Sequence, residues 1–380
     1  MAVYHQMGHD SENLLHHEHL DRFRGAILSP LNYRPDDVRD QAIEASRREG
    51  FELIFDPQLY YPSTERGCLR QWPYFPADID TADPSADGWW TSLVDNIVEC
   101  CSPLGVQAIC SPVIVPRTYD DAYLIRAVDV ADRLSRALRG GSPDAIQTIV
   151  LGLSDMASLD RALGFASIIS RTVAQRVYLV FVGTTEPRRE LSDPEELKGA
   201  MRLVMELERC GLRVLVGFCS TELILWKHAG ASDCATGKFF NLRRFTKSRF
   251  EEPSAGGGQL PYWFEESLVA FLRESDVIRM RDNKLFSGAS LSNPFCQQIL
   301  EKLAYEPGAP WIALGWRQFM CWFAAFEERV RTNQTEVPVF LKEVEEHWKR
   351  LDDRGVLLEE MRNDGSWVRQ WRRAAIEYNK

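Results

Sequence analysis

Short apolar runs alternate with longer segments of helical period along the first two-thirds of the chain. Uninterrupted apolar runs predict strands that are covered on both faces, because a strand with one face in water would alternate apolar with polar residues. Seven segments carry this strand pattern: 26–29, 53–56, 106–111, 148–151, 177–182, 214–218 and 231–233. Helical patterns follow most of them, near 35–49, 91–101, 119–138, 158–175, 195–209 and up to residue 228. We therefore predict an α/β protein with a parallel sheet.

Two architectures share this alternation, a TIM-type (β/α)8 barrel and a doubly wound open sheet. The open sheet usually carries a glycine-rich nucleotide fingerprint after its first strand, and Ser29-Pro30-Leu31-Asn32 has no such glycines. We therefore favour the barrel and place it at residues 25–285. Residues 1–24 hold five of the seven histidines, and we expect them to form a mobile N-terminal segment.

The pattern changes towards the C-terminus. We predict an amphipathic helix near Trp263 to Arg273, and beyond about Phe295 only helical patterns occur. Residues 286–380 are therefore expected to form a helical C-terminal region. Its Trp311, Trp316 and Trp322 are spaced at helical period, which is typical of core or domain-contact residues.

Composition and charge narrow the class of protein. A chain of 380 residues predicts one large domain with an appendage, and 45% apolar residues exclude general disorder. The net charge of -10 argues against general coating of nucleic acid but leaves a local basic site open. No apolar run approaches the roughly 20 residues that span a bilayer, and the N-terminus lacks the pattern of a signal peptide. We expect a cytoplasmic protein that does not enter membranes.

Cysteine and histidine usage limits the possible chemistry. The nine cysteines include no Cys-x-x-Cys pair, so we expect buried reduced thiols and neither a zinc ribbon nor a redox motif. Outside the first 19 residues only His228 and His347 remain, which leaves little material for a histidine metal centre or a Ser-His-Asp triad. The His16 to His19 cluster could bind a metal, but a mobile terminus is the simpler explanation. We predict no metal and no cofactor.

Residues that follow the apolar runs are the candidates for function, because the active sites of barrels lie at the carboxyl ends of the strands. If the barrel is right, Asp56, Glu186 and Asp233 should converge at one mouth as acid–base or covalent catalysts. Gln58 shortly follows the same apolar run as Asp56, Ser111 ends the run 106–111, and both are binding candidates. Each carboxylate could instead cap a helix or pair with an arginine. We prefer this alternative for Asp155 and Glu222, and leave it open for Asp56 and Asp233.

A basic cluster follows the last strand candidate. Five cations lie within twelve residues among phenylalanines: Lys238, Arg243, Arg244, Lys247 and Arg249. They could hold a phosphate group or a nucleic-acid backbone while the aromatic rings stack or pack. A solvated basic loop is the alternative, and we weigh it slightly higher. The long irregular stretch from Pro57 to Gly88 carries further aromatic residues, between Tyr60 and Phe75, that could cover a bound base.

The stretch from Leu212 to Asp233 resembles the tRNA-guanine transglycosylase family. The similarity rests on Leu215-Val216-Gly217, a helix that begins near Thr221-Glu222-Leu223, and Gly230-Ala231-Ser232-Asp233-Cys234. Upstream, Leu151-Gly152-Leu153-Ser154 and Phe181-Val182-Gly183 near Glu186 resemble two glycine-bearing strand ends of that family.

The resemblance implies a barrel enzyme in which an aspartate attacks the ribose carbon, releases a purine, and lets a different base take its place. Asp233 would be the nucleophile, and Gly152 and Gly183 would line the base pocket. The chain departs from the family at Ser232, which occupies the first Asp position. It also lacks the zinc motif, since only Cys296 lies nearby.

Three functions follow from these patterns. The first is a transglycosylase-like barrel protein that acts on a nucleobase or nucleotide in nucleic acid, with an aspartate nucleophile. The second is a non-catalytic barrel that binds tRNA, DNA or a protein partner, the latter through its C-terminal helices. The third is a hydrolase for a small acidic metabolite, in which the basic cluster clamps a phosphate.

Overall fold

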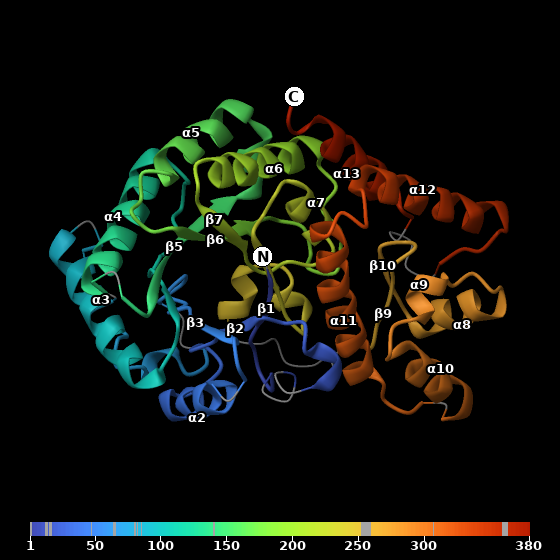
Figure 1. Ribbon diagram of the computed structural model, residues 1–380, viewed down its shortest axis with the longest axis horizontal. Coiled ribbons are helices and arrows are strands. Elements are labelled where there is room, and N and C mark those ends of the chain that lie inside the picture. Colours follow the sequence, from blue (N-terminus) through green and yellow to red (C-terminus); the bar gives the residue numbers. More distant parts are fainter. Residues whose placement is uncertain are drawn as a thin grey trace.

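The computed structural model describes residues 2–11, 14, 17–46, 48–63, 66–79, 81, 83–84, 86–139, 141–251, 260–306, 308–358 and 364–380. Eight parallel strands form a closed barrel, in which each strand pairs with the next and β8 pairs with β1 (Figure 1). The strands are β1 Ala2–Gln6, β2 Gly25–Leu28, β3 Glu52–Phe55, β4 Ala108–Cys110, β5 Asp144–Gly152, β6 Arg176–Val182, β7 Arg213–Val216 and β8 Asp233–Thr236. The predicted TIM-type barrel is confirmed.

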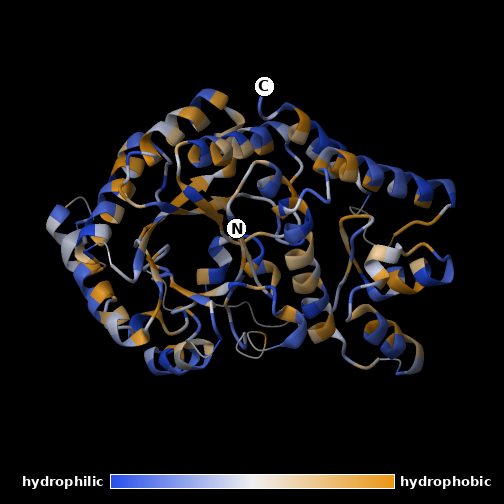
Figure 2. Ribbon diagram, in the orientation of Figure 1, coloured by the Kyte–Doolittle hydropathy of each residue, from blue (hydrophilic) through white to orange (hydrophobic). Residues whose placement is uncertain are grey.

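Helices surround the barrel and continue into a C-terminal lobe (Figure 1). Those that follow the strands are α2 Pro35–Ser46, α3 Asp87–Cys101, α4 Asp121–Ala137, α5 Leu159–Ile169, α6 Pro194–Arg209 and α7 Leu223–His228. The later ones are α8 Glu274–Asp282, α9 Gly288–Leu291, α10 Cys296–Tyr305, α11 Ile312–Arg331, α12 Val337–Asp353 and α13 Ser366–Glu377. Apolar residues gather on the strands, while the helices carry apolar and polar residues on different sides (Figure 2).

The first barrel strand lies where we predicted a mobile segment, so that prediction is wrong for residues 2–6. β1 pairs with β2 on one side and with β8 on the other, and closes the barrel. Its side chains at Tyr4 and Gln6 bond to residues of other strands across the interior. A polar interior explains why this strand has no apolar run in the sequence.

The C-terminal region is part of the barrel wall. Helix α11 contacts β1, α7 and the short 3-10 helix η1 Glu18–Leu20, so it covers the barrel between β8 and β1. The buried apolar residues of the barrel and of the C-terminal helices form one continuous core. The predicted boundary at residue 285 therefore does not separate two cores. The prediction that the Trp-rich helix supplies core residues is confirmed, since Trp311 and Trp322 are buried.

The predicted helix from Trp263 to Arg273 is wrong, because this segment forms an antiparallel hairpin. Its strands are β9 Trp263–Glu265 and β10 Ala270–Leu272. The side chain of Gln318 on α11 accepts from the Phe264 amide at 2.8 Å and donates to the Phe264 carbonyl oxygen at 2.9 Å, as a neighbouring strand would. This tertiary contact outweighs the local helical pattern. Within the described residues, no helix is both long and apolar enough to cross a membrane.

Candidate functional site

Strand β3 places two acidic side chains, Glu52 and Asp56, on the inward side of the barrel. Glu52, at the start of β3, bonds to Arg176 and to the Tyr4 hydroxyl group, which come from β6 and β1. Glu52 therefore points into the barrel, and the two-residue period of a strand places Asp56 on the same inward face. Asp56 follows the last residue of β3, at the end where barrel enzymes carry their active sites.

Asp56 is a buried carboxyl group, only 2% exposed. Its oxygens accept hydrogen bonds from the Gln58 amide at 3.0 Å and from the Tyr60 hydroxyl group at 2.9 Å. Burial raises the pKa of Asp56 to about 6, although both hydrogen bonds and the charge of Arg249 oppose the shift. Asp56 can therefore exchange a proton near neutral pH.

Arg249 supplies the positive charge beside Asp56. It lies on the short 3-10 helix η6 Lys247–Phe250, is buried, and donates to Ser29 at 3.1 Å and to Asn32 at 3.0 Å. Burial lowers the pKa of Arg249 to about 10, so its guanidinium stays charged at neutral pH. Its Nε has no hydrogen-bond partner. Arg249 therefore keeps an unused donor at the centre of the barrel mouth.

Gln58 adds a second buried donor. Its Oε1 accepts from the Leu31 amide and from Ser29, and its Nε2 is buried. The Gln58 side chain also acts as a hydrogen-bond donor to Asp56, which helps to lower the pKa of that carboxyl group. The Leu31 amide can only donate, which fixes the orientation of the Gln58 side chain. Gln58 holds its backbone at φ 55°, a conformation that non-glycine residues adopt at a cost. The strained turn and the buried donor keep Gln58 a binding candidate at the barrel mouth.

Aromatic rings cover this centre. Tyr60 packs edge-on against Phe245 and Phe250, with ring centroids 5.0 Å and 5.8 Å apart. Trp72 and Tyr74, from the predicted base-covering stretch, are instead buried against Phe55 in the core. Tyr60 therefore lies over the mouth, whereas Trp72 and Tyr74 belong to the core beside it.

A second polar centre lies between the carboxyl ends of β6 and β7. Arg244 is buried and pairs with Glu222 at 3.4 Å, so the predicted structural alternative for Glu222 holds. Glu190 accepts a hydrogen bond from the Thr221 hydroxyl group. Burial and the charge of Glu222 raise the pKa of Glu190 to about 8, and burial raises that of Glu222. Glu190 and Glu222 thus share the positive charge of Arg244. Because one positive charge does not neutralise two buried carboxylates, one of the two carboxyl groups is favoured to keep its proton at neutral pH.

A small cavity of about 20 Å³ adjoins Glu222 and Arg244. Gly183, which we predicted to bind substrate, lines it together with Phe218. A space of this size holds about one water molecule. Gly183 and Arg244 are thus brought together at this cavity. The ring of Phe218 lies between them and Arg249, and its centroid is 5.9 Å from the Arg249 guanidinium carbon.

Asp233 does not lie at this mouth, so the predicted convergence with Asp56 and Glu186 is wrong. Asp233 is the first residue of β8 and pairs in register with Ala2, at the amino end of the barrel. It accepts from the Ala2 amide at 2.7 Å and pairs with Arg213 at 3.1 Å. The apolar run that we took for the last strand precedes β8, and this placed Asp233 at the wrong end.

Three other predicted residues take separate positions. Glu186 follows β6 but is 46% exposed and pairs with Arg188 and Arg189. Ser111 uses its hydroxyl oxygen to accept from the Thr148 amide at 2.9 Å. Gly152 makes room for Asp155 and Tyr119, since a Cβ there would lie 2.4 Å from the Asp155 carboxylate. All three are explained by local structure.

The basic cluster is largely buried, so the solvated loop that we favoured is wrong. Arg243 donates to the carbonyl oxygens of Gly237 and Lys238 and lies 3.8 Å from the Phe319 ring centroid. Lys238 donates to the Asp10 carbonyl oxygen at 2.7 Å, and only Lys247 is exposed, at 67%. These cations hold the segment after β8 against the barrel and α11. Sequence spacing alone could not show which side they face.

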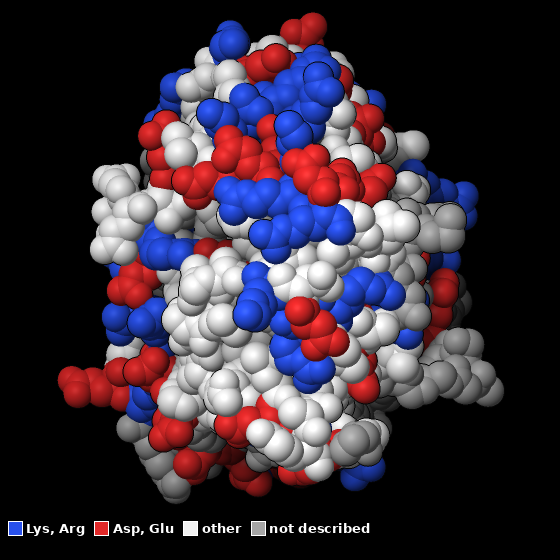
Figure 3. Space-filling model, turned by 90° about the vertical axis from the view of Figure 1, so that its right-hand side faces the viewer, with Lys and Arg blue, Asp and Glu red and all other residues white. Residues whose placement is uncertain are grey.

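The described residues include no group of three or more His, Cys, Asp or Glu side chains placed to hold a metal ion. The nine cysteines are free thiols, and burial raises the pKa of Cys101 and Cys110. His16, part of the candidate histidine cluster, lies outside the described residues. On the side of the C-terminal lobe, positive and negative side chains lie close together in the upper part of the view, and a broad, mostly uncharged area lies below them (Figure 3).

No protein-family model and no curated protein matches the chain. Solved structures with a similar fold include an aldolase named QR15, with 14% identity over 62% of this chain and 89% of that chain, at a TM-score of 0.36. A tryptophan synthase complex from Pyrococcus furiosus has 16% identity over 62% of this chain and 86% of that chain, at a TM-score of 0.37. An L-ribulose 3-epimerase has 10% identity over 88% of this chain and 97% of that chain, at a TM-score of 0.40. At these values none of them bears on function.

Proposed function

We propose that the chain is an enzyme whose reaction takes place at the carboxyl end of the barrel, with Asp56 as the group that moves a proton. The observation that carries this proposal is the buried carboxyl group of Asp56 beside Arg249, with a pKa of about 6. Proton transfer is most effective when the pKa of the catalyst lies near the working pH.

Buried donors around Asp56 indicate the class of substrate. Arg249 Nε has no partner, and Gln58 Nε2 is a second buried donor beside Asp56, whereas both Asp56 oxygens already accept hydrogen bonds. A buried donor without a partner costs free energy, and a ligand that offers acceptors recovers it. Phosphate, carboxylate and the acceptor edge of a nucleobase all fit this requirement. The donors therefore support a substrate rich in acceptor atoms.

Base exchange in nucleic acid, the reaction that the sequence resemblance implies, is the specific form that we propose to test first. Asp56 takes the role that we had expected of Asp233. Protonated Asp56 would donate its proton to the old base as that base leaves, and the resulting carboxylate would then bond to the sugar carbon. The incoming base would displace the carboxylate from that carbon and give its own proton to Asp56. Two aspartates at opposite ends of one barrel make this assignment testable.

The test follows incorporation of radiolabelled guanine into tRNA and into duplex DNA. We expect the intact chain to incorporate label, Asp56→Asn to lose incorporation, and Asp233→Asn to keep it. Circular dichroism shows that each variant folds. Equal incorporation by Asp56→Asn and the intact chain would refute the role of Asp56. If the intact chain incorporates nothing, base exchange is excluded, and turnover of small phosphorylated compounds becomes the assay for Asp56.

A further inference from the structure

Four buried residues at the barrel mouth form a continuous series of hydrogen bonds that ends at Asp56. Arg249 donates from Nη2 to the Ser29 hydroxyl oxygen at 3.1 Å. Ser29 in turn lies 3.0 Å from Oε1 of Gln58 as a donor, and the Gln58 backbone amide donates to Asp56 at 3.0 Å. Each of the four residues is at most 4% exposed, so little water competes for these bonds.

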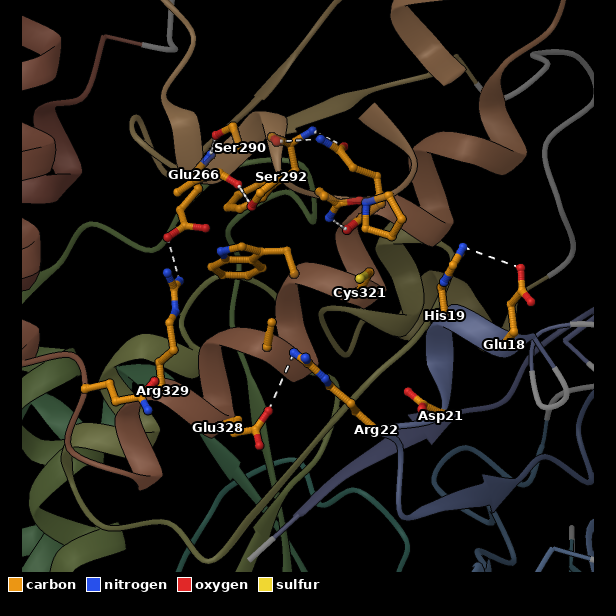
Figure 4. A pocket seen from close by; sticks show the side chains of 18 of the residues that line it. Glu18, His19, Asp21, Arg22, Glu266, Ser290, Ser292, Cys321, Glu328 and Arg329 are labelled. Atoms are coloured by element: carbon orange, nitrogen blue, oxygen red, sulfur yellow. Dashed lines mark hydrogen bonds and ion pairs between the residues drawn. The ribbon is translucent and has the colours of Figure 1, made fainter. Parts of the chain in front are cut away.

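The groove on the outside of the barrel, between the segment that precedes β2 and helix α11, is arranged differently (Figure 4). Its volume is about 700 Å³, and each of its two arginines pairs with a glutamate of the same groove. Arg22 pairs with Glu328 at 3.5 Å, and Arg329 pairs with Glu266. These pairs are explained by local structure, whereas the series at the barrel mouth leads from a charged donor to the proposed catalytic group.

Ser29 is the residue through which Arg249 reaches Gln58. Its hydroxyl group has one hydrogen, and its oxygen lies 3.0 Å from two acceptors, Gln58 Oε1 and Asn32 Oδ1. Asn32 Oδ1 already accepts from the charged Arg249 at 3.0 Å. Gln58 Oε1 accepts from the neutral Leu31 amide at the longer distance of 3.2 Å. Gln58 Oε1 is therefore the less satisfied acceptor and takes the Ser29 hydrogen.

The charge of Arg249 acts on Asp56 through this series as well as through space. Hydrogen bonds in a buried site polarise one another, so each bond of the series strengthens the next. The Gln58 side chain is itself a donor to Asp56, and this bond and the Arg249 charge both lower the pKa of that carboxyl group. Burial raises the pKa of the other titratable groups that interact with Asp56, which are therefore uncharged at neutral pH: Tyr60, Tyr74, Cys110 and Tyr178.

We propose that Ser29 is a positioning residue for the reaction at the barrel mouth, which orients the Gln58 side chain and carries the influence of Arg249 to Asp56. The inference rests on the proposed function, in which Asp56 moves the proton. Ser29 acts through these neighbours and not on the substrate, because its oxygen is already bonded to Arg249 and Gln58. Loss of its hydroxyl group weakens the hold on the ionised form of Asp56 and favours the protonated form.

The test is the titration of Asp56 by NMR, with carbon-13 in the side-chain carboxyl group, in the intact chain and in variants that circular dichroism shows to be folded. Ser29→Ala should raise the pKa of Asp56 by about half a unit, because the ionised form loses hydrogen-bond support. Gln58→Met keeps the backbone amide but removes the side-chain bonds, and should raise the pKa at least as much. The double variant should match Gln58→Met alone, because Ser29 acts through Gln58.

Ser111→Ala is the matched control. Ser111 is also a buried serine after a barrel strand, but its hydroxyl oxygen accepts from the Thr148 amide. The pKa of Asp56 should not change in this variant. An unchanged pKa in Ser29→Ala, an equal shift in the control, or additive shifts in the double variant would overturn the role of Ser29. If the pKa shifts as expected but the intact chain incorporates no base, Ser29 keeps its role in holding Asp56, and only the proposed reaction is refuted.

Discussion

A buried ion pair joins the barrel to the C-terminal helices. Lys227 on α7 lies 2.9 Å from Glu327 on α11, with side-chain exposures of 2% and 5%. Lys227 also donates to the carbonyl oxygens of Ala231 and Ser232, at 2.8 Å and 3.0 Å. Glu327 has a second, more exposed partner in Arg331 at 3.6 Å. We predict that Lys227→Met destabilises the whole barrel and not the C-terminal lobe alone.

The magnitude follows from the charge that is left behind. Removing one partner of a buried pair typically costs about 3 to 5 kcal/mol, because the other charge stays buried without compensation. Arg331 still neutralises part of the Glu327 charge, which places Lys227→Met near the lower value, at about 3 kcal/mol. Replacing both residues, as Lys227→Met with Glu327→Leu, leaves no buried charge and should cost much less than the single change.

The assay is urea unfolding of the intact chain and the variants, followed by tryptophan fluorescence. A lower urea concentration at the midpoint of unfolding, with the same dependence of the unfolding free energy on urea, reports a loss of stability. If Lys227→Met costs less than about 1 kcal/mol, the pair behaves as an exposed one and our account of α11 as barrel wall is wrong. A double variant as unstable as the sum of the two single ones would also contradict the reasoning.

Three further predictions concern packing and charge. Gly199→Ala on α6 should lower the free energy of unfolding by about 2 kcal/mol or more in urea, because a Cβ there would lie 1.7 Å from the Met156 carbonyl oxygen. Gly164→Ala on α5 should instead raise it by about 0.5 to 1 kcal/mol, because a Cβ there meets open space. Asp233→Ala should cost about 1 to 3 kcal/mol, since the Ala2 amide and Arg213 lose their partner, without changing any activity of the barrel mouth. Asp56 has a pKa of about 6 in the folded chain, above its ordinary value of 3.8. Between pH 3.8 and pH 6 the folded chain therefore binds more protons than the unfolded chain, and its stability falls as the pH rises through this range. Asp56→Asn should abolish this fall and be more stable than the intact chain at pH 7, by up to about 3 kcal/mol in pH-dependent urea unfolding.

The sequence predicted those strands whose apolar character is plain. Six of the eight observed strands coincide with apolar runs, because both of their faces are covered. The sequence does not indicate β1, since Tyr4 and Gln6 face a polar interior and His5 lies within the strand. The β9–β10 hairpin was taken for a helix because its stability comes from Gln318, 54 residues away.

The candidate site was found in part. Asp56 and Gln58 directly follow a clear strand, so the barrel rule located them. The sequence indicates Arg249 only as a member of a basic cluster and does not indicate Glu190, because both lie in connections after strands, whose course the local sequence does not determine. For Asp233 the error came from the strand boundary, since its strand begins rather than ends there. Glu52 at the start of β3 and Asp56 just after its end are four residues apart, and this spacing is the signal in the sequence that indicates an inward polar face.

The pKa of Asp56 is the measurement that tests the central claim most directly. Aspartate labelled with carbon-13 in the side-chain carboxyl group allows titration by NMR, and the Asp56→Asn spectrum identifies its signal. Our account predicts a titration near pH 6, together with retention of the fold throughout. A signal that titrates at or below 3.8 would show a permanently ionised carboxylate that only caps the turn before Gln58, and would contradict the proposed acid–base role.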